Sequence, residues 1–263
     1  IMFKELLPRV YMIIEEIDRR FREAMEKRGC ADYETLRKTS ILWDNTIRMA
    51  NLSIIGSHSV NGVAALHSEI LKKDVFPDFQ AIYPNRFNNK TNGVSHRRFM
   101  IQSNPSLARL ITDLIGDEWL RDFKRIEKLL DYKNDPSVTA CLRQLKKENK
   151  RRLAEYIKKN AGISIDTDSV FDIQVKRIHA YKRQLLNVFK IMDLYNRIKE
   201  NPDLDILPYT FIFAGKAAQG YAFAKEVVQL INAVASLVNS DPLVSQKIKL
   251  VFVENFCVSN AQL

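Results

Sequence analysis

Four basic side chains within one short segment of the sequence have the chemistry to bind an anion. The segment covers residues 176–183 and contains Lys176, Arg177, Lys182 and Arg183. Arginine presents a planar pair of donors that suits a phosphate group, and lysine supplies a compact point charge. A solvated basic helix face has the same composition, so charge alone leaves both interpretations open.

The elements predicted around this segment place it where ligands usually bind. Residues 170–175 predict a strand, and apolar residues at helical spacing predict a helix over 179–199. Apolar runs at 209–214 and 247–253 predict two further strands, with a helix over 221–238 between them. This β-α-β-α-β order predicts a parallel sheet with right-handed crossovers. Open parallel sheets bind ligands beyond the carboxyl ends of their strands, which favours anion binding by the basic segment.

The residues before this sheet are predicted to be mainly helical. Apolar side chains recur at helical spacing over 9–27, 61–72, 106–115, 117–130 and 136–160. Residues 50–56 form a short apolar run ending in glycine, which predicts a buried strand. Residues 77–98 are turn-rich and polar, so we expect a loop there.

Composition narrows the class of protein. The chain has 263 residues, of which 46% are hydrophobic and 27% charged, so it can bury a sizeable core and disorder is not expected. No apolar run reaches the roughly 18 residues that a membrane span needs, so we expect no membrane partner. The three cysteines fit no metal-binding spacing, which predicts no metal site and a reduced, cytoplasmic setting.

The net charge of +10 would attract anionic partners. The basic residues are dispersed, with short clusters at 146–152 and 176–183, and they are not interleaved with aromatic residues. A nucleic-acid-binding protein would be expected to show such interleaving or a recognisable motif. We therefore expect a phosphorylated small molecule or phosphate itself, and no nucleic acid.

Five strings that follow one another in order carry a resemblance to a known family. They are GSHSVNGVA at 56–64, FNNKTNGV at 87–94, FDIQVKRIHAYKRQ at 171–184, GKAA at 215–218 and NSDPLV at 239–244. Together these strings resemble the α-glucan phosphorylase family, which includes glycogen, starch and maltodextrin phosphorylases. The resemblance runs over essentially the whole chain.

The resemblance implies a reaction and a cofactor. Enzymes of this family use inorganic phosphate to cleave the terminal α-1,4-linked glucosyl unit of a glucan, giving glucose 1-phosphate with retention of configuration. They require pyridoxal phosphate, whose phosphate group exchanges a proton with the substrate phosphate. The implied partners are phosphate and a glucan, and the implied assembly is a homodimer.

The resemblance also assigns roles to residues of the basic segment. Arg177 and Lys182 are expected to hold the substrate phosphate, while Lys176 and Lys182 are expected to lie near the cofactor phosphate. Cations between two neighbouring phosphates would offset the repulsion between them. His179 falls within the same string, and for this residue a structural role is the favoured interpretation.

Four further positions receive roles from the resemblance. His58 and Asn92 are expected to bind the glucosyl unit, although Asn92 before a glycine is also typical of a turn. Phe99 stands where the family usually has a tryptophan against the cofactor, and Phe256 stands where a tyrosine usually approaches the cofactor ring. Phenylalanine keeps the apolar face but lacks the tyrosine hydroxyl, so these two departures question the tuning of the cofactor.

The implied fold is α/β and forms part of a two-domain glycosyltransferase-B architecture, with two Rossmann-like domains, truncated at both ends. Residues 1–92 are expected to be the end of the N-terminal domain. Residues 93–263 are expected to start the C-terminal domain, with a helical linker over 104–160 before the sheet. The lysine that holds the cofactor covalently is expected beyond Leu263, so the chain alone is predicted to be inactive.

Two other interpretations remain open at this point. A sugar-nucleotide glycosyltransferase of the same fold would use the basic segment to hold a diphosphate. A non-catalytic fragment would use it for no reaction. The ordered strings argue against the first, and neither the preferred glucan nor any regulation follows from the sequence.

Overall fold

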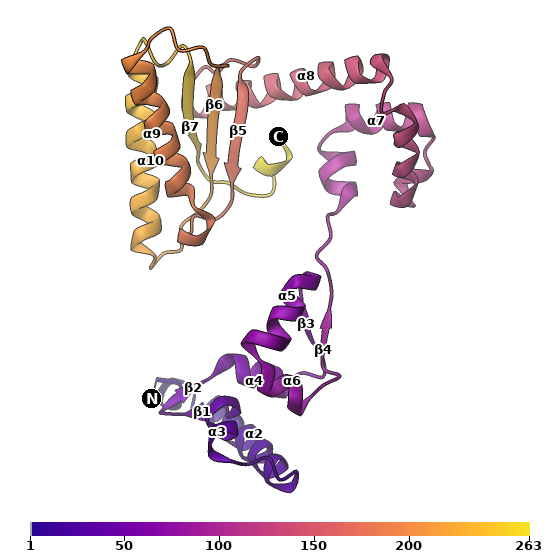
Figure 1. Cartoon of the computed structure of the whole chain (residues 1–263), viewed down its shortest axis with the longest axis vertical. Helices are drawn as coiled ribbons and strands as arrows, with labels where there is room; N and C mark the ends of the chain where they lie inside the picture. The colour runs from indigo at the N-terminus through magenta and orange to yellow at the C-terminus, as the bar shows by residue number, and fades with distance from the viewer. Residues whose placement is uncertain (1) are drawn as a thin grey trace. The chain divides into compact units, whose positions relative to one another are not determined.

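The computed structural model describes residues 2–263, which form two compact units (Figure 1). The first unit extends to Val94, and the second covers Ser95–Leu263. Both units mix helices with small parallel sheets. Among the described residues, no helix combines the length and apolar character required to cross a membrane.

Short helices and two small sheets make up the first unit. Its elements in chain order are α1 (Met2–Leu6), α2 (Pro8–Lys27), α3 (Tyr33–Thr39), β1 (Leu42–Trp43), β2 (Thr46–Ile47), α4 (Met49–Gly56), β3 (Val60–Gly62), α5 (Ala65–Ile70), the π-helix η1 (Leu71–Val75), α6 (Pro77–Ile82) and β4 (Phe87–Asn89). Its core consists of Phe21, Met25, Ile54, Phe79 and Phe87. The helix predicted over 9–27 is confirmed as α2, in which Pro8 occupies the first turn.

The strand predicted at 50–56 and the loop predicted at 77–98 are both wrong. Residues 50–56 belong to the helix α4, in which Asn51 and Ile54 are buried three residues apart on one helical face. The Asn51 side chain donates to the carbonyls of Lys38 and Ser40, each at 2.9 Å, which holds this helix against the preceding chain. A short apolar run does not by itself distinguish the two structures.

The stretch predicted as a loop, 77–98, contains α6 and β4 and reaches into the π-helix η2 (Arg97–Gln102). Strand β4 pairs in parallel with β3, and Val60 lies opposite Phe87. The helix predicted over 61–72 begins later than expected, because β3 occupies its start. Helix α5 begins at Ala65 and continues into η1, which ends at Val75. Strands β3 and β4 are far apart in the sequence, so their pairing produces no local sequence pattern from which it could be predicted.

The second unit begins with helices and ends with a parallel sheet. Its elements are η2 (Arg97–Gln102), α7 (Pro105–Ile115), η3 (Glu118–Leu120), η4 (Phe123–Tyr132), α8 (Pro136–Ala161), β5 (Val170–Val175), η5 (Ala180–Lys182), α9 (Gln184–Glu200), β6 (Tyr209–Ala214), α10 (Ala222–Ser240), β7 (Ile248–Val253) and η6 (Asn260–Gln262). The helices predicted over 106–115 and 136–160 are confirmed as α7 and α8. The helix predicted over 117–130 is divided into the 3-10 segments η3 and η4.

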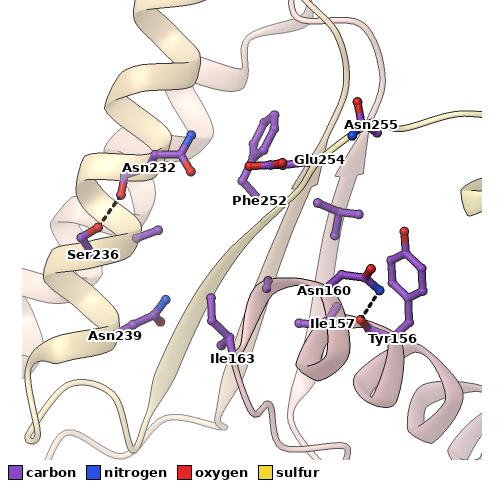
Figure 2. A pocket seen from close by; sticks show the side chains of 13 residues that line it. Tyr156, Ile157, Asn160, Ile163, Asn232, Ser236, Asn239, Phe252, Glu254 and Asn255 are labelled. Carbon is purple, nitrogen blue, oxygen red and sulfur yellow. Dashed lines mark hydrogen bonds between the residues drawn. The ribbon is translucent and has the colours of Figure 1, made fainter.

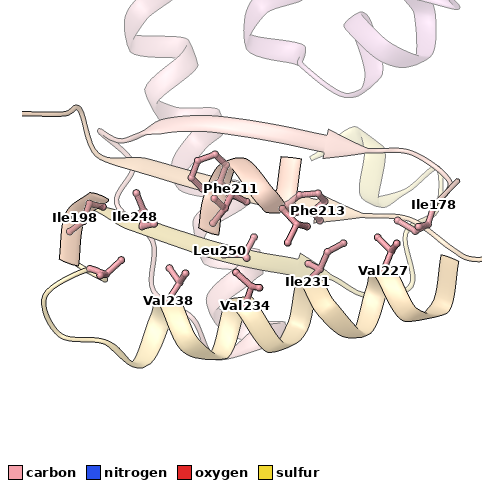
Figure 3. Packing of buried hydrophobic residues seen from close by; sticks show 14 of the residues in the cluster. Ile178, Ile198, Phe211, Phe213, Val227, Ile231, Val234, Val238, Ile248 and Leu250 are labelled. Atoms are coloured by element: carbon pink, nitrogen blue, oxygen red, sulfur yellow. The ribbon is translucent and has the colours of Figure 1, made fainter. Parts of the chain in front are cut away.

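The predicted parallel sheet is confirmed, with strand order β5-β6-β7. Helices α9 and α10 pack on one face, where Phe211, Phe213 and Leu250 are buried (Figure 3). Residues Ile212 and Val251 point to the opposite face and pack against the end of α8. Because all three strands are parallel, their carboxyl ends lie at the same edge of the sheet.

The helix predicted over 179–199 begins five residues later than expected, at Gln184. Arg183 has a left-handed backbone conformation, with φ of 58°, which interrupts the chain between η5 and α9. The basic segment therefore forms a loop with a single 3-10 turn, and only its last residue adjoins the helix.

The side chain of Asn239 on α10 forms hydrogen bonds with the backbone of β7, a strand at the edge of the sheet. The Asn239 side-chain amide donates to the Leu250 carbonyl at 2.7 Å and accepts from the Leu250 N–H at 3.1 Å. Both backbone groups of an edge-strand residue are thus satisfied by one side chain, as a neighbouring strand would satisfy them.

Asp241, which follows α10, connects that helix to α9 and to the turn before β7. Its carboxylate accepts from Lys199 at 2.9 Å and from the Tyr195 hydroxyl at 3.0 Å. It also accepts from the backbone N–H groups of Leu243 and Val244. The hydrogen bond from Lys199 is the largest of the effects that lower the pKa of Asp241 to about 2.

This pKa predicts how the second unit responds to acid. A carboxyl group with a lower pKa in the folded chain stabilises the fold above its unfolded pKa of about 4 and loses that contribution as the pH falls toward the folded pKa. We expect the advantage of the wild-type chain over Asp241→Asn, measured as free energy of unfolding in urea, to shrink from about pH 4 to about pH 2. If the difference in free energy of unfolding between the two chains stays the same over this pH range, the lowered pKa of Asp241 is contradicted.

Candidate functional site

The basic segment starts as a continuation of strand pairing. The Lys176 N–H donates to the Ala214 carbonyl at 3.0 Å, and the Ile178 N–H donates to the Lys216 carbonyl at 3.3 Å. The Ile178 side chain is buried in the core beneath α9 and α10. These contacts fix the first residues of the segment to the carboxyl end of β6.

Gly215 allows this close approach of two backbones. Its φ of 153° is a conformation that residues with a side chain rarely adopt. A Cβ atom added at this position would lie 2.1 Å from the carbonyl oxygen of Lys176. The glycine is thus required by the path of the basic segment.

The basic segment carries cations that have no acidic partner. Lys176, Arg177 and Arg183 are exposed, and Lys182 is half-buried. Throughout residues 2–263, no carboxylate lies within 4.0 Å of the charged nitrogens of these four side chains. Nearby on α9, by contrast, Lys190 pairs with a carboxylate of β5 at 2.9 Å. An uncompensated group of cations at the carboxyl edge of a parallel sheet suits an anionic ligand.

Three of these cations, Lys176, Lys182 and Arg183, line a shallow pocket of about 750 Å³ between β5 and α9. Asn187 also lines this pocket. The predicted phosphate ligand Arg177 is not among the lining residues, and Asp193 contributes one carboxylate. The structure therefore brings Lys176 and Lys182 to one pocket, while Arg177 adjoins Lys176 in the chain but lies outside that pocket. The phosphate-binding roles of all three residues remain predictions.

Aromatic rings surround the middle of the segment. His179 lies between Tyr181 and Tyr221, with ring centroids 4.3 and 5.1 Å away. The Tyr221 hydroxyl accepts a hydrogen bond from the Ala180 N–H at 3.3 Å. These contacts support the structural role favoured for His179, because they fix the turn between the two ends of the segment.

Three amide side chains near the segment were missed by the sequence analysis. Gln174, Gln184 and Asn187 form hydrogen bonds within and around the segment. The only sequence signal is that Gln174 precedes the basic segment and that Gln184 and Asn187 follow it closely, a position that is also compatible with exposed amides.

The two residues predicted to contact a cofactor ring both lie in the second unit. Phe256 follows β7 and is half-buried, at the same sheet edge as the basic segment. Phe99 lies in η2 and is 45% exposed.

The thiol of Cys257, which follows Phe256, has a lowered pKa. A hydrogen bond from the Asn260 backbone is the largest cause, and the charge of Lys216 acts in the same direction.

The two residues predicted to bind a glucosyl unit lie in the first unit. The Asn92 N–H donates to the Val63 carbonyl at 3.0 Å, so this asparagine follows the parallel pair β3–β4 and has an exposed side chain. His58 is exposed after α4 and lines a pocket of about 310 Å³ with Tyr83 and Arg86. The glucosyl-binding roles of both residues remain predictions.

A second cavity in the second unit holds none of the predicted residues. It has a volume of about 650 Å³ and lies beside β7, between α10 and the end of α8 (Figure 2). Polar side chains of Asn160, Asn232 and Ser236 line it, but Asn160 and Asn232 donate to carbonyls of their own helices. The described residues contain no cluster of side chains suited to a metal ion.

Comparisons with known proteins identify relatives over the whole chain. A family model described as carbohydrate phosphorylase matches residues 1–263. A glycogen phosphorylase of Bacillus subtilis (strain 168) is 48% identical over 261 residues, which cover 99% of this chain and 33% of the relative. The muscle form of glycogen phosphorylase from Bos taurus is 44% identical, and glycogen phosphorylase 2 of Dictyostelium discoideum is 47% identical. The match to the Bos taurus protein covers 99% of this chain and 31% of that relative, and the match to the Dictyostelium discoideum protein covers 100% of this chain and 27% of that relative. The chain spans about a third or less of the length of these relatives.

Substitution of Gly215 tests whether the backbone contact positions the segment. Gly215→Ala forces the added Cβ against Lys176, so we expect the free energy of unfolding to fall by about 1–3 kcal/mol. The matched control is Gly220→Ala in the same connection, where an added Cβ meets nothing within 4 Å. Urea unfolding measures both variants, and equal effects of the two substitutions would contradict this explanation.

Proposed function

The chain belongs to the carbohydrate phosphorylase family, and from this premise we propose that residues 176–183 form the phosphate-binding part of an α-glucan phosphorylase. The reaction proposed for the whole protein is phosphorolysis: inorganic phosphate cleaves a terminal α-1,4-linked glucosyl unit and gives glucose 1-phosphate with retention. The similarity to glycogen phosphorylases supports glycogen or a similar glucan as substrate.

The observation that carries this proposal is the uncompensated charge at the carboxyl edge of the sheet. Four cations within the segment have no carboxylate within ion-pair distance among the described side chains. Bringing cations together without a partner is unfavourable, and a bound phosphate offsets that cost. In this proposal Arg177 and Lys182 bind the substrate phosphate, because an arginine fork and a lysine point charge complement one another on a tetrahedral anion.

The basic segment also fits a second phosphate. Lys176 and Lys182 line one pocket of about 750 Å³, and this donor set suits the phosphate of pyridoxal phosphate. In the chemistry that the family resemblance implies, bound pyridoxal phosphate supplies a phosphate group for proton exchange with the substrate phosphate. Within this proposal Lys176 and Lys182 hold that group, while Phe99 and Phe256 offer apolar surface to its ring.

The remaining expectations are part of the same proposal. Asn92 and His58 bind the glucosyl unit, and the two units are parts of two Rossmann-like domains in a glycosyltransferase-B architecture. The whole protein acts as a cytoplasmic homodimer. The α/β composition of both units and their small parallel sheets support this architecture.

Calorimetric titration of the chain with orthophosphate tests the proposal. Removing a charged donor from a phosphate contact costs about 1.5–3 kcal/mol, so we expect Arg177→Ala and Lys182→Ala each to weaken binding at least about tenfold. The control is Arg151→Ala on α8, an exposed arginine that is paired with Glu148. We expect this control to bind phosphate as the wild-type chain does.

Two outcomes would contradict the proposal. Equal losses in all three variants would indicate nonspecific attraction by the net charge. Binding of a uridine diphosphate sugar without any binding of orthophosphate would instead favour a sugar-nucleotide glycosyltransferase, because the same cations would then hold a diphosphate.

A further inference from the structure

Gln184, the first residue of α9, is a polar side chain with almost no contact with solvent. Its exposed fraction is 1%, whereas the charged side chains before it are mostly exposed. A buried amide needs partners for both its donor and its acceptor, because an unpaired one costs about 1–3 kcal/mol. The partners of Gln184 therefore indicate why an apolar residue does not occupy this position.

Both partners belong to the basic segment. The Gln184 Nε2 donates to the Arg177 carbonyl at 3.0 Å, and its Oε1 accepts from the His179 N–H at 3.4 Å. One side chain thus joins the start of α9 to the backbone of Arg177, seven residues earlier. These bonds fix how far the start of the segment lies from its end.

A second glutamine holds the other end of the segment. The Gln174 Nε2 donates to the Lys182 carbonyl at 3.1 Å, and its Oε1 accepts from the Asn187 side chain at 3.1 Å. Gln174 lies on β5 and Asn187 on α9, so strand and helix together orient this amide. Each glutamine therefore bonds the carbonyl of one of the two cations proposed to bind substrate phosphate.

We infer that Gln184 and Gln174 are positioning residues that set the spacing of Arg177 and Lys182 for a phosphate between them. The inference rests on the proposed function, and it adds residues that do not touch the anion themselves. Exposed side chains on a mobile backbone would lose conformational entropy on binding, and fixing the backbone beforehand reduces that loss. Removing a glutamine should therefore weaken phosphate binding although no charge is lost.

The test uses Gln184→Met, which keeps the length of the side chain and removes both hydrogen bonds. Loss of a neutral hydrogen bond that fixes the site predicts phosphate binding about 3- to 10-fold weaker by calorimetry of the chain. In the Arg177→Ala background the same substitution should change phosphate affinity less than about twofold, because Gln184 acts through Arg177. A general effect on stability would not produce this non-additivity.

Asn239→Ala is the matched control. This substitution also removes two hydrogen bonds from a side chain to the backbone in the same unit. The backbone groups it releases belong to Leu250 on β7 and not to the basic segment. We expect it to lower stability in urea and to leave phosphate affinity unchanged. If Gln184→Met does not fold, Gln174→Met is measured in its place, with Lys182→Ala as the background.

The outcomes separate this inference from the proposed function. Failure of the wild-type chain to bind orthophosphate overturns both. The positioning role alone is overturned if Arg177→Ala weakens phosphate binding but both glutamine variants bind phosphate as strongly as the wild-type chain does. Equal losses in Asn239→Ala and Gln184→Met also overturn it, because stability would then explain the effect.

Discussion

The proposed phosphate site depends on positive charges without acidic partners at the carboxyl ends of a parallel sheet, where like charges repel one another. Residues 176–183 carry four positive charges, three of which line one pocket, and among the described side chains none of the four has an acidic partner. Such a group is unfavourable by itself and becomes favourable when an anion lies among the charges. The fold must therefore hold the backbone of this segment in place without using its charged side chains.

Contacts of the backbone and of neutral side chains meet this requirement. Pairing with the end of β6, the glycine at 215 and the buried Ile178 fix the start of the segment. The Tyr221 hydroxyl fixes its middle, and the amides of Gln174 and Gln184 fix the backbone of Lys182 and Arg177, the two residues proposed to bind phosphate. Because none of these groups carries a charge, they leave the positive potential of the site undiminished. The core between the sheet and helices α9 and α10 supports all of them.

The sequence predicted the sheet and the basic segment better than it predicted their surroundings. Strands β5, β6 and β7 fall at or within one residue of the predicted ranges. Strands β6 and β7 are largely buried and apolar, as is typical of parallel strands, whereas β5 was predicted from its β-branched and aromatic residues. The strand predicted at 50–56 is a helix, and the loop predicted at 77–98 contains a strand, since short runs are ambiguous and the pairing of β3 with β4 is long-range. Charge and position made Lys176 and Lys182 candidates for anion binding, whereas Gln184 became a candidate only through its burial in the structure.

The central claim is that the segment binds phosphate, and nuclear magnetic resonance of the backbone amides tests it most directly. Orthophosphate titrated into the chain, with chloride as the reference, should produce saturable shifts in residues 176–183 and in the adjoining Gly215 and Lys216. The other short basic cluster, at 146–152, serves as an internal comparison because it lies on α8. Saturable shifts confined to the segment and its neighbours are the predicted result. Shifts that are equal in both clusters, or that do not saturate, would contradict a specific phosphate site.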